Sequence, residues 1–231
     1  MPRKKGPSSL RAISLKNICE NFELICYGMT WSHPEWREVL KSGRYLSVSS
    51  PLKALPVHVL SELAEVVLDD LGSAPHILHA VIQPQLTRIR LPATLRTVPL
   101  AVKLIVERTH KLASFELTSC RSVNPLVVAA VVPYLSHLTH LNVEGTQFDD
   151  FGVSQLGSWV GGLLALNIAR TRVSEAGLAL LEDKLQDLTF CIILGNTNRI
   201  SPPSVLRYFR SVLSYRGVVS YLIIVVEMTN N

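Results

Sequence analysis

The chain of 231 residues lacks most of the features that mark secreted, membrane or metal-binding proteins. Its four cysteines include no C-x-x-C pair, so neither a zinc site nor a disulfide framework is indicated. No N-x-S/T acceptor occurs, and Lys16 interrupts the apolar stretch that a signal peptide would need. The longest apolar run, 218–226, is broken by Ser220 and is too short to span a bilayer. These absences predict no membrane association and a cytoplasmic or nuclear location.

Catalytic signatures are also missing. No G-x-x-x-x-G-K-S/T, G-x-G-x-x-G, H-E-x-x-H or G-x-S-x-G motif is present. His76 and His79 could share one side of a helix, but no third ligand follows nearby, so we expect a surface or capping role for them. Asp149 and Asp150 open a helical segment, where the positive helix end stabilises carboxylates. We therefore expect no enzymatic activity, no cofactor and no metal.

Positive charge is concentrated at the beginning of the chain. The net charge is +5, and Arg3, Lys4, Lys5 and Arg11 stand among Gly, Pro and Ser residues. This composition predicts a frayed, disordered head over 1–13. The run is short and has no interleaved aromatic residues, so we do not expect nucleic-acid binding. The remainder, in a chain that is 48% hydrophobic and 18% charged, can bury a core.

An internal repeat is the dominant feature of the sequence. Each copy has three apolar residues spaced as apolar-x-x-apolar-x-apolar, then two further residues, and then Thr, Cys or Asn. The copies run from Leu86 to Thr94, Leu112 to Cys120, Leu138 to Thr146, Leu163 to Thr171 and Leu188 to Asn196. Starts at 86, 112, 138, 163 and 188 give intervals of 26, 26, 25 and 25 residues. This period lies in the range of leucine-rich repeats.

The spacing has a simple physical meaning. The apolar-x-apolar core is a short strand whose alternate side chains point inward, and successive strands pair in parallel. The Thr, Cys or Asn can satisfy backbone groups where the chain leaves the strand. Apolar residues around Gly152 and Gly177 mark helical return segments, and Pro133 ends or bends an earlier one. We predict an α/β leucine-rich-repeat solenoid of about five repeats over 73–210.

Side chains between the inward positions form the concave surface of such a solenoid, where we expect a client protein to bind. This surface runs from basic through polar to apolar. The predicted client-binding residues are Arg88, Arg90, Glu116, His140, Asn142, Asn167, Phe190 and Ile192. The apolar residues of the last strand would have to be shielded from water. Either a partner or the β-forming segment within the atypical C-terminal region, 211–231, could do this. That region carries no obvious polar cap, which a repeat array normally needs for solubility. We therefore expect the array to be truncated, as in an alternative terminus of a longer protein.

The segment 14–72 lacks the repeat and has helical periodicity. Ser14 is a plausible N-cap, and Leu15, Cys19 and Phe22 follow on one helical face. A second helix opens at Leu55-Pro56, because proline suits the first helical turn. The simplest interpretation is a helical cap that covers the first repeat, as solenoids require.

A resemblance to a known family gives a second interpretation. Ser14-Leu15-Lys16-Asn17-Ile18-Cys19 resembles the elongin-binding box, S/T-L-x-x-x-C, of substrate receptors of cullin ubiquitin ligases. Together with Phe22, it is similar to the opening of the Zyg/Zer receptors. In those receptors the box is followed by a cullin box and then by leucine-rich repeats. Here Leu55, Pro56, Val59 and Leu63 match the cullin box, and the repeats begin at Leu86.

The resemblance implies particular partners and contacts. Ser14, Leu15, Ile18, Cys19 and Phe22 would bind elongin C, within an elongin B/C pair. The cullin-box residues would contact a cullin, and ubiquitin transfer would be done by partner subunits. The box usually has an aliphatic residue four positions after the cysteine, where this chain has Glu23. The large helical region by which Zyg/Zer receptors read an N-terminal glycine has no counterpart here.

Two alternatives remain open from the sequence. Leu55-Pro56 with Leu60 and Leu63 also suits the start of an F-box, which would engage a different ligase adaptor. The chain could instead be a general repeat scaffold with a plain helical cap. Burial of Leu15 and Cys19 against the chain's own core would favour the cap, whereas exposure of both on one helix face would favour the ligase box.

Overall fold

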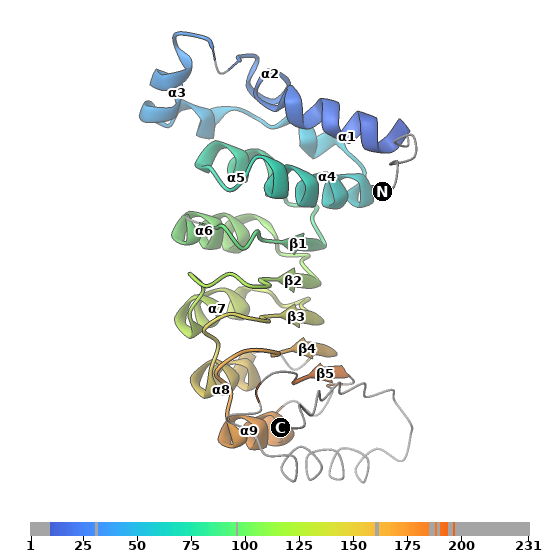
Figure 1. Cartoon of the computed structure of the whole chain (residues 1–231), viewed down its shortest axis with the longest axis vertical. Helices are drawn as coiled ribbons and strands as arrows, with labels where there is room; N and C mark the ends of the chain where they lie inside the picture. The colour runs from blue at the N-terminus through green and yellow to red at the C-terminus, as the bar shows by residue number, and fades with distance from the viewer. Residues whose placement is uncertain are drawn as a thin grey trace, which may run out of the picture.

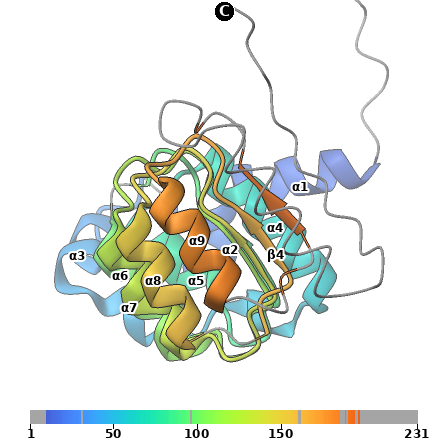
Figure 2. The same ribbon diagram turned by 90° about the horizontal axis from the view of Figure 1, so that it is seen from below.

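A computed structural model of the chain describes residues 10–30, 32–95, 97–159, 162–184, 188, 190–193 and 196. Helices and strands alternate along most of this part and stack into an elongated array, with the N-terminal helices at one end (Figure 1). Seen along the array, the helices α6 to α9 form one layer and the strands form the other (Figure 2). The predictions for residues 1–9 and 211–231 lie outside the described residues.

The N-terminal region consists of helices. Its α-helices are α1 (Leu10–Glu20), α2 (Phe22–Tyr27), α3 (Trp36–Ser42), α4 (Val57–Asp70) and α5 (Pro75–Val81). Two short 3₁₀ helices lie between α3 and α4, namely η1 (Arg44–Ser47) and η2 (Pro51–Ala54). The predicted N-cap at Ser14 is wrong, because α1 begins at Leu10 and the Ser14 hydroxyl donates to the Leu10 carbonyl inside the helix. The predicted second helix is confirmed, with Pro56 immediately before α4.

The predicted strands pair in parallel, which confirms the mixed helical and parallel-sheet architecture. The described residues form the strands β1 (Arg88–Arg90), β2 (Ser114–Glu116), β3 (His140–Asn142), β4 (Ala165–Asn167) and β5 (Phe190–Ile192). They pair in chain order, and each predicted inward residue is paired with the next, beginning with Ile89 and Phe115. These central residues are buried, as the period of two requires.

Helices return the chain from one strand to the next. They are α6 (Val98–Arg108), α7 (Pro125–Val131), α8 (Asp150–Trp159) and α9 (Glu175–Lys184). Pro133 lies in the 3₁₀ helix η3 (Val132–Tyr134) that follows α7, as predicted for a residue that ends the helix. The two return-segment glycines are sites of close approach. A Cβ on Gly152 would lie 2.3 Å from the Phe148 ring, and one on Gly177 would lie 2.3 Å from the Asp150 carboxylate.

Equivalent turns follow the strands. Ser119, Gly145 and Arg170 stand one repeat interval apart and all have positive φ, of 60°, 67° and 54°. A Cβ on Gly145 would meet Ser119 Oγ at 3.2 Å, so glycine serves both the conformation and the close stacking there. The motif-ending residues bond the backbone as predicted. Cys120 Sγ donates to the Pro92 carbonyl, and buried Asn196 accepts from the Thr171 amide at 2.9 Å.

A single apolar core runs from the N-terminal helices through the array. It includes Phe22 on α2, Leu63 on α4, Ile89 on β1 and Leu181 on α9. A smaller cluster formed by Trp36, Val39 and Tyr45 holds α3 and η1 together. The N-terminal helices are therefore continuous with the packing of the sheet. The boundary predicted at residues 72 and 73 stays a prediction.

Candidate functional site

The box-like residues lie along α1 and the start of α2, where they face the chain's own core. Cys19 and Phe22 are buried, and Leu15 and Ile18 are half-buried against the same core. Ser14 is exposed. Because α1 packs on α4, the side chains of Cys19 and Phe22 already have an intramolecular environment. By the criterion set above, this placement favours the cap interpretation for these two residues and leaves Leu15 and Ile18 partly accessible.

Glu23, the departure from the box pattern, has a partner inside the protein. Its Oε1 lies 3.8 Å from Nε2 of His76 on α5, and both side chains are almost fully buried. The Trp36 indole meets the His76 ring edge-on at 5.4 Å, and the Tyr27 hydroxyl donates to the His76 carbonyl. The carboxylate at this position thus lies in the interior beside an α5 imidazole, where the box pattern would place an aliphatic side chain.

His76 and His79 lie in the interior, so the predicted surface role is wrong. Tyr45 packs edge-on against both rings, and Arg108 donates to the His79 carbonyl at 3.0 Å. Burial lowers the pKa of His76 to about 4. Burial first, and then the Arg108 charge, lower the pKa of His79. Both rings are therefore neutral at neutral pH and serve as packing elements beneath α2, α3 and η1.

The cullin-box-like residues lie at the beginning of α4. Pro56 is exposed, Leu55 and Val59 are half-buried, and Leu63 is fully buried in the core. Pro56 and Val59 can therefore meet a second protein without rearrangement of the helix. Leu63 serves the core instead, which its apolar type and helical spacing equally allow.

The outward side chains of the sheet form a continuous surface, which we call the strand face. Arg88, Arg90 and His140 are exposed there, and Glu116, Asn142, Asn167 and Ile192 are half-buried. The structure thus brings these predicted client-binding residues together on one side of five paired strands. Phe190 belongs to β5, but its side chain lies outside the described residues.

Carboxylates neutralise the arginines that the sequence suggested as a basic stripe. Arg88 lies 2.8 Å from a Glu116 oxygen and 3.4 Å from a Glu65 oxygen, and Arg90 lies 3.8 Å from Asp69. Glu65 and Asp69 come from α4, which packs beside β1 (Figure 1). The first stripe therefore carries alternating charge rather than a positive field. The sequence gives one signal for this arrangement, because Glu65 and Asp69 stand four residues apart on one side of α4.

Polar contacts organise the other end of the strand face. Asn142 Oδ1 accepts from the Glu144 amide, and Asn167 Oδ1 accepts from the Ala169 amide, both at 3.0 Å. Glu144 also accepts from Asn167 at 3.2 Å and lies 3.8 Å from Arg170. Side-chain amides held in this way present their remaining hydrogen-bonding groups in fixed positions, which suits recognition of a protein surface.

The cysteines lie in the interior of the protein and not on these surfaces. All four cysteines are free and buried, and burial raises the pKa of each thiol, to about 11 for Cys120 and about 12 for Cys191. Within the described ranges, no three His, Cys, Asp or Glu side chains are grouped closely enough to hold a metal ion. Nor does any helix in that part of the chain combine the length and apolar character needed to cross a membrane.

Comparisons with known proteins find similarity in structure only. No protein-family description and no curated protein sequence matches the chain. A chain of the yeast complex of Rad7 and Elc1 matches with a TM-score of 0.51 and 16% identity, over 82% of this chain and 46% of that chain. The leucine-rich repeat-containing protein LegL7 from Legionella pneumophila gives a TM-score of 0.36 and 12% identity, over 62% of this chain and 59% of that one.

The first similarity establishes a shared fold. It extends over most of the described elements, yet the protein spans less than half the length of the chain from the Rad7 and Elc1 complex. At this level of identity, the likeness concerns the fold alone.

Proposed function

We propose that the protein is a protein-binding adaptor without catalytic activity. In this proposal the array is a leucine-rich-repeat solenoid of about five units, and the strand face binds a client protein. The observation that carries the proposal is the strand face itself, where the first four of five strands in register present polar side chains, from Arg88 on β1 to Asn167 on β4. An ordered polar surface of this kind, next to an independent helical surface, suits a protein that holds two partners at once.

We further infer a role as a substrate-recognition or adaptor subunit of an elongin–cullin ubiquitin ligase, in the cytoplasm or nucleus. The box-like and cullin-box-like sequences precede the repeats in the same order as in the receptors they resemble. Leu15 and Ile18 would supply the apolar contact with elongin C, in the manner of a helix laid in a groove. Pro56 and Val59 would contact the cullin. The chain with the shared fold is itself in a complex with a second protein, which supports this assembly mode.

The second candidate is a general repeat scaffold with a plain helical cap. Burial of Cys19 and Phe22 against the core favours it, because a groove contact through those residues would require α1 to leave α4. The two candidates make opposite predictions about one property that can be measured. This property is whether the half-buried side of α1 binds a second protein.

Co-expression with elongins B and C separates the candidates. A Leu15→Ser/Ile18→Ser variant removes the proposed contact. A Leu10→Ser/Ile13→Ser variant of the same helix is the matched control, since both of its residues are exposed. Each lost apolar anchor costs about 2 kcal/mol or more at the centre of an interface. We expect the intact chain and the control to co-purify with the elongins and the first variant, still folded by circular dichroism, to be lost.

The other outcomes are equally definite. No co-purification of the intact chain would overturn the ligase role and leave the scaffold. Loss through the control variant alone would overturn the assignment of Leu15 and Ile18. Selective binding to the ligase adaptor that F-box proteins use, and not to the elongins, would show that the N-terminal region acts as an F-box-like segment.

A further inference from the structure

The first two helices form an end layer of the array. α1 and α2 lie across this end, next to α4 (Figure 1). The amides of Asn21 and Ile25 donate to the carbonyls of Asn17 and Asn21, so helical bonding continues from α1 into α2. We call residues 10–27 the lid. A layer inside an array packs against neighbours on both sides, whereas an end layer has a neighbour on one side only and is held less firmly.

Few buried apolar side chains anchor the lid. Cys19 is the buried residue of α1, and α2 adds Phe22 and Cys26. The buried residues of α4 are more numerous, namely Leu60, Leu63, Ala64, Val67 and Leu68. Other large apolar side chains of the lid are turned to solvent and add little to its docking. They are Leu10, Ile13, Leu24 and Ile25. Elements with few buried apolar contacts open more readily than the rest of a fold.

The described contacts that hold the lid on the array come from side chains. Arg11 forms an exposed ion pair with Glu62 on α4, and the Tyr27 hydroxyl donates to the His76 carbonyl. Successive repeats are instead joined by backbone hydrogen bonds, as between β1 and β2. Exposed ion pairs contribute little to stability. The lid is therefore attached more weakly than one repeat is attached to the next.

Glu23 weakens the closed arrangement further. Its carboxylate lies in the interior, 3.8 Å from the His76 imidazole, which is neutral at neutral pH. Removal of a carboxylate from water carries a free-energy cost, and opening of the lid would return the group to water. An aliphatic side chain, which the box pattern has at this position, would favour the closed lid instead.

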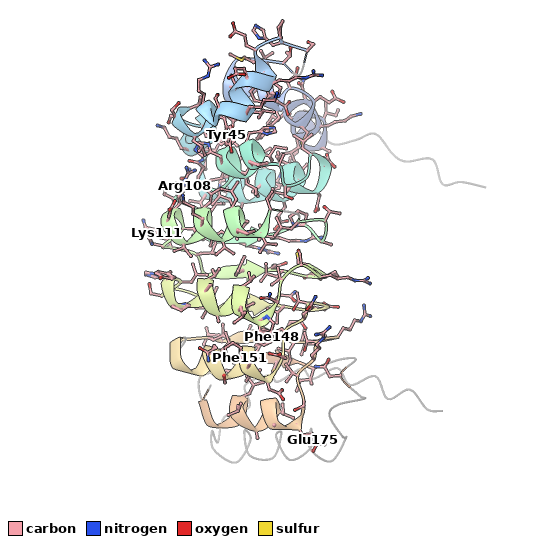
Figure 3. All side chains as sticks on the ribbon, turned by 90° about the vertical axis from the view of Figure 1, so that its left-hand side faces the viewer. Tyr45, Arg108, Lys111, Phe148, Phe151 and Glu175 are labelled. Atoms are coloured by element: carbon pink, nitrogen blue, oxygen red, sulfur yellow. The ribbon has the colours of Figure 1, made fainter. Side chains whose placement is uncertain are left out.

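The chain after the lid provides a hinge and a fixed base. Gly28 caps α2 with a φ of +67°, and beyond its chain neighbours no atom lies within 4 Å of a Cβ placed on it. The Tyr45 ring on η1 lies 6.0 Å from the His79 ring, and Arg108 donates to the His79 carbonyl; Figure 3 shows Tyr45 and Arg108 near each other. Small residues at the ends of elements often absorb the rotation of a hinge. The segment after Gly28 can therefore stay attached when the lid moves.

We propose that the lid opens from α4 as one unit, about a hinge at Gly28, while the array stays folded. The open form is a minor population that exposes Cys19 and Phe22 and uncovers the half-buried Leu15 and Ile18. Docking of the lid on α4 thus inhibits binding of these side chains by a partner with an apolar groove. This consequence for binding rests on the adaptor role proposed above, whereas the opening itself does not.

Hydrogen–deuterium exchange of the full chain in low concentrations of urea tests the opening. We expect the amides of α1 and α2 to exchange together, with protection at least about tenfold lower than that of α4 and of β1 to β4. A Glu23→Leu change should slow exchange in both helices several-fold. Glu20→Leu is the matched control, because Glu20 is exposed and Glu and Leu have similar helix propensities.

Other patterns of exchange would contradict the proposal. Equal protection in the lid and in β1 to β4 would mean that the lid opens only when the whole chain unfolds. Rapid exchange of α1 without α2 would indicate fraying of the first helix and no hinge at Gly28. An effect of Glu23→Leu that is confined to α2, or that Glu20→Leu reproduces, would also refute the reasoning.

A reversible lock tests the consequence for binding. The Asp70 carboxylate at the end of α4 lies beside the Cys19 thiol, so an Asp70→Cys change places a second thiol where a disulfide would fasten the lid to α4. Once mass spectrometry confirms the disulfide, the oxidised variant should lose co-purification with elongins B and C, and reduction should restore it. The intact chain, treated in the same way, should bind in both conditions.

The outcomes of the lock separate the two proposals. Equal capture of the oxidised and reduced variant would overturn the inhibitory role of the closed lid. Failure of both forms and of the intact chain to capture elongins would overturn the ligase role, while exchange of the chain alone would still decide whether the lid opens.

Discussion

The packing between α8 and α9 makes a quantitative prediction about Gly177. Asp150 accepts from the Ser174 amide at 2.7 Å and from the Ser174 hydroxyl, so the carboxylate of one repeat caps the helix of the next. A Cβ on Gly177 would lie 2.3 Å from Asp150 Oδ1 and 2.8 Å from Val173 Cγ1. Overpacking costs about 1–3 kcal/mol and loss of a cap about 1 kcal/mol, while the better helix propensity of alanine returns up to about 1 kcal/mol. Gly177→Ala should therefore destabilise the fold by about 2 kcal/mol.

Urea unfolding measures this effect, with a midpoint about 1 M lower at an m-value near 2 kcal/mol/M. Gly162→Ala is the control, because nothing lies within 4 Å of its added Cβ. Asp150→Ala removes the atom that the new methyl group would meet, so Gly177→Ala should cost at least about 1 kcal/mol less in that background. Equal effects at Gly177 and Gly162, or strict additivity with Asp150→Ala, would refute the reasoning.

Three other predictions concern the interior. His76 has a folded-state pKa near 4, below its usual 6.5, so stability should fall as the pH drops from about 6.5 to 4, and His76→Gln should flatten this dependence in urea titrations. The cysteines should resist iodoacetamide at pH 8 until the protein unfolds, because burial raises the pKa of every thiol to about 11 or 12; modification of the native protein, seen by mass spectrometry, would contradict this. Asn196→Ala should cost about 1–3 kcal/mol by leaving buried backbone groups unpaired, whereas exposed Asn17→Ala should change the melting temperature little.

The repeat region was predictable because the residues within each motif determine its local structure. Alternation around Ile89 or Phe115 defines which side chains point inward, and a near-constant interval requires equivalent residues to pair. The motif-ending residues followed from hydrogen-bonding capacity, as the contacts of Cys120 and Asn196 show. Such features depend on residues close in sequence or one interval apart, and the sequence displays both relations directly.

The N-terminal region was less predictable because its contacts join residues that no interval relates. The burial of Glu23 beside His76 brings together positions 53 residues apart, and the ion pair of Arg88 with Glu65 joins β1 to α4. The positions of the polar residues in the sequence do not indicate which carboxylate side chain is buried. The start of α1 was placed too late because Ser14 is a good cap by type, yet its hydroxyl can also bond within a helix.

Hydrogen–deuterium exchange of the chain alone and with purified elongins B and C tests the proposed function most directly. The proposal predicts slower exchange over α1 and α2, residues 10–27, while the amides of β1 to β4 stay unchanged and free for a client. Unchanged exchange over residues 10–27 in the presence of saturating elongins, or protection confined to the strands, would contradict the adaptor role and leave a repeat scaffold with a helical cap.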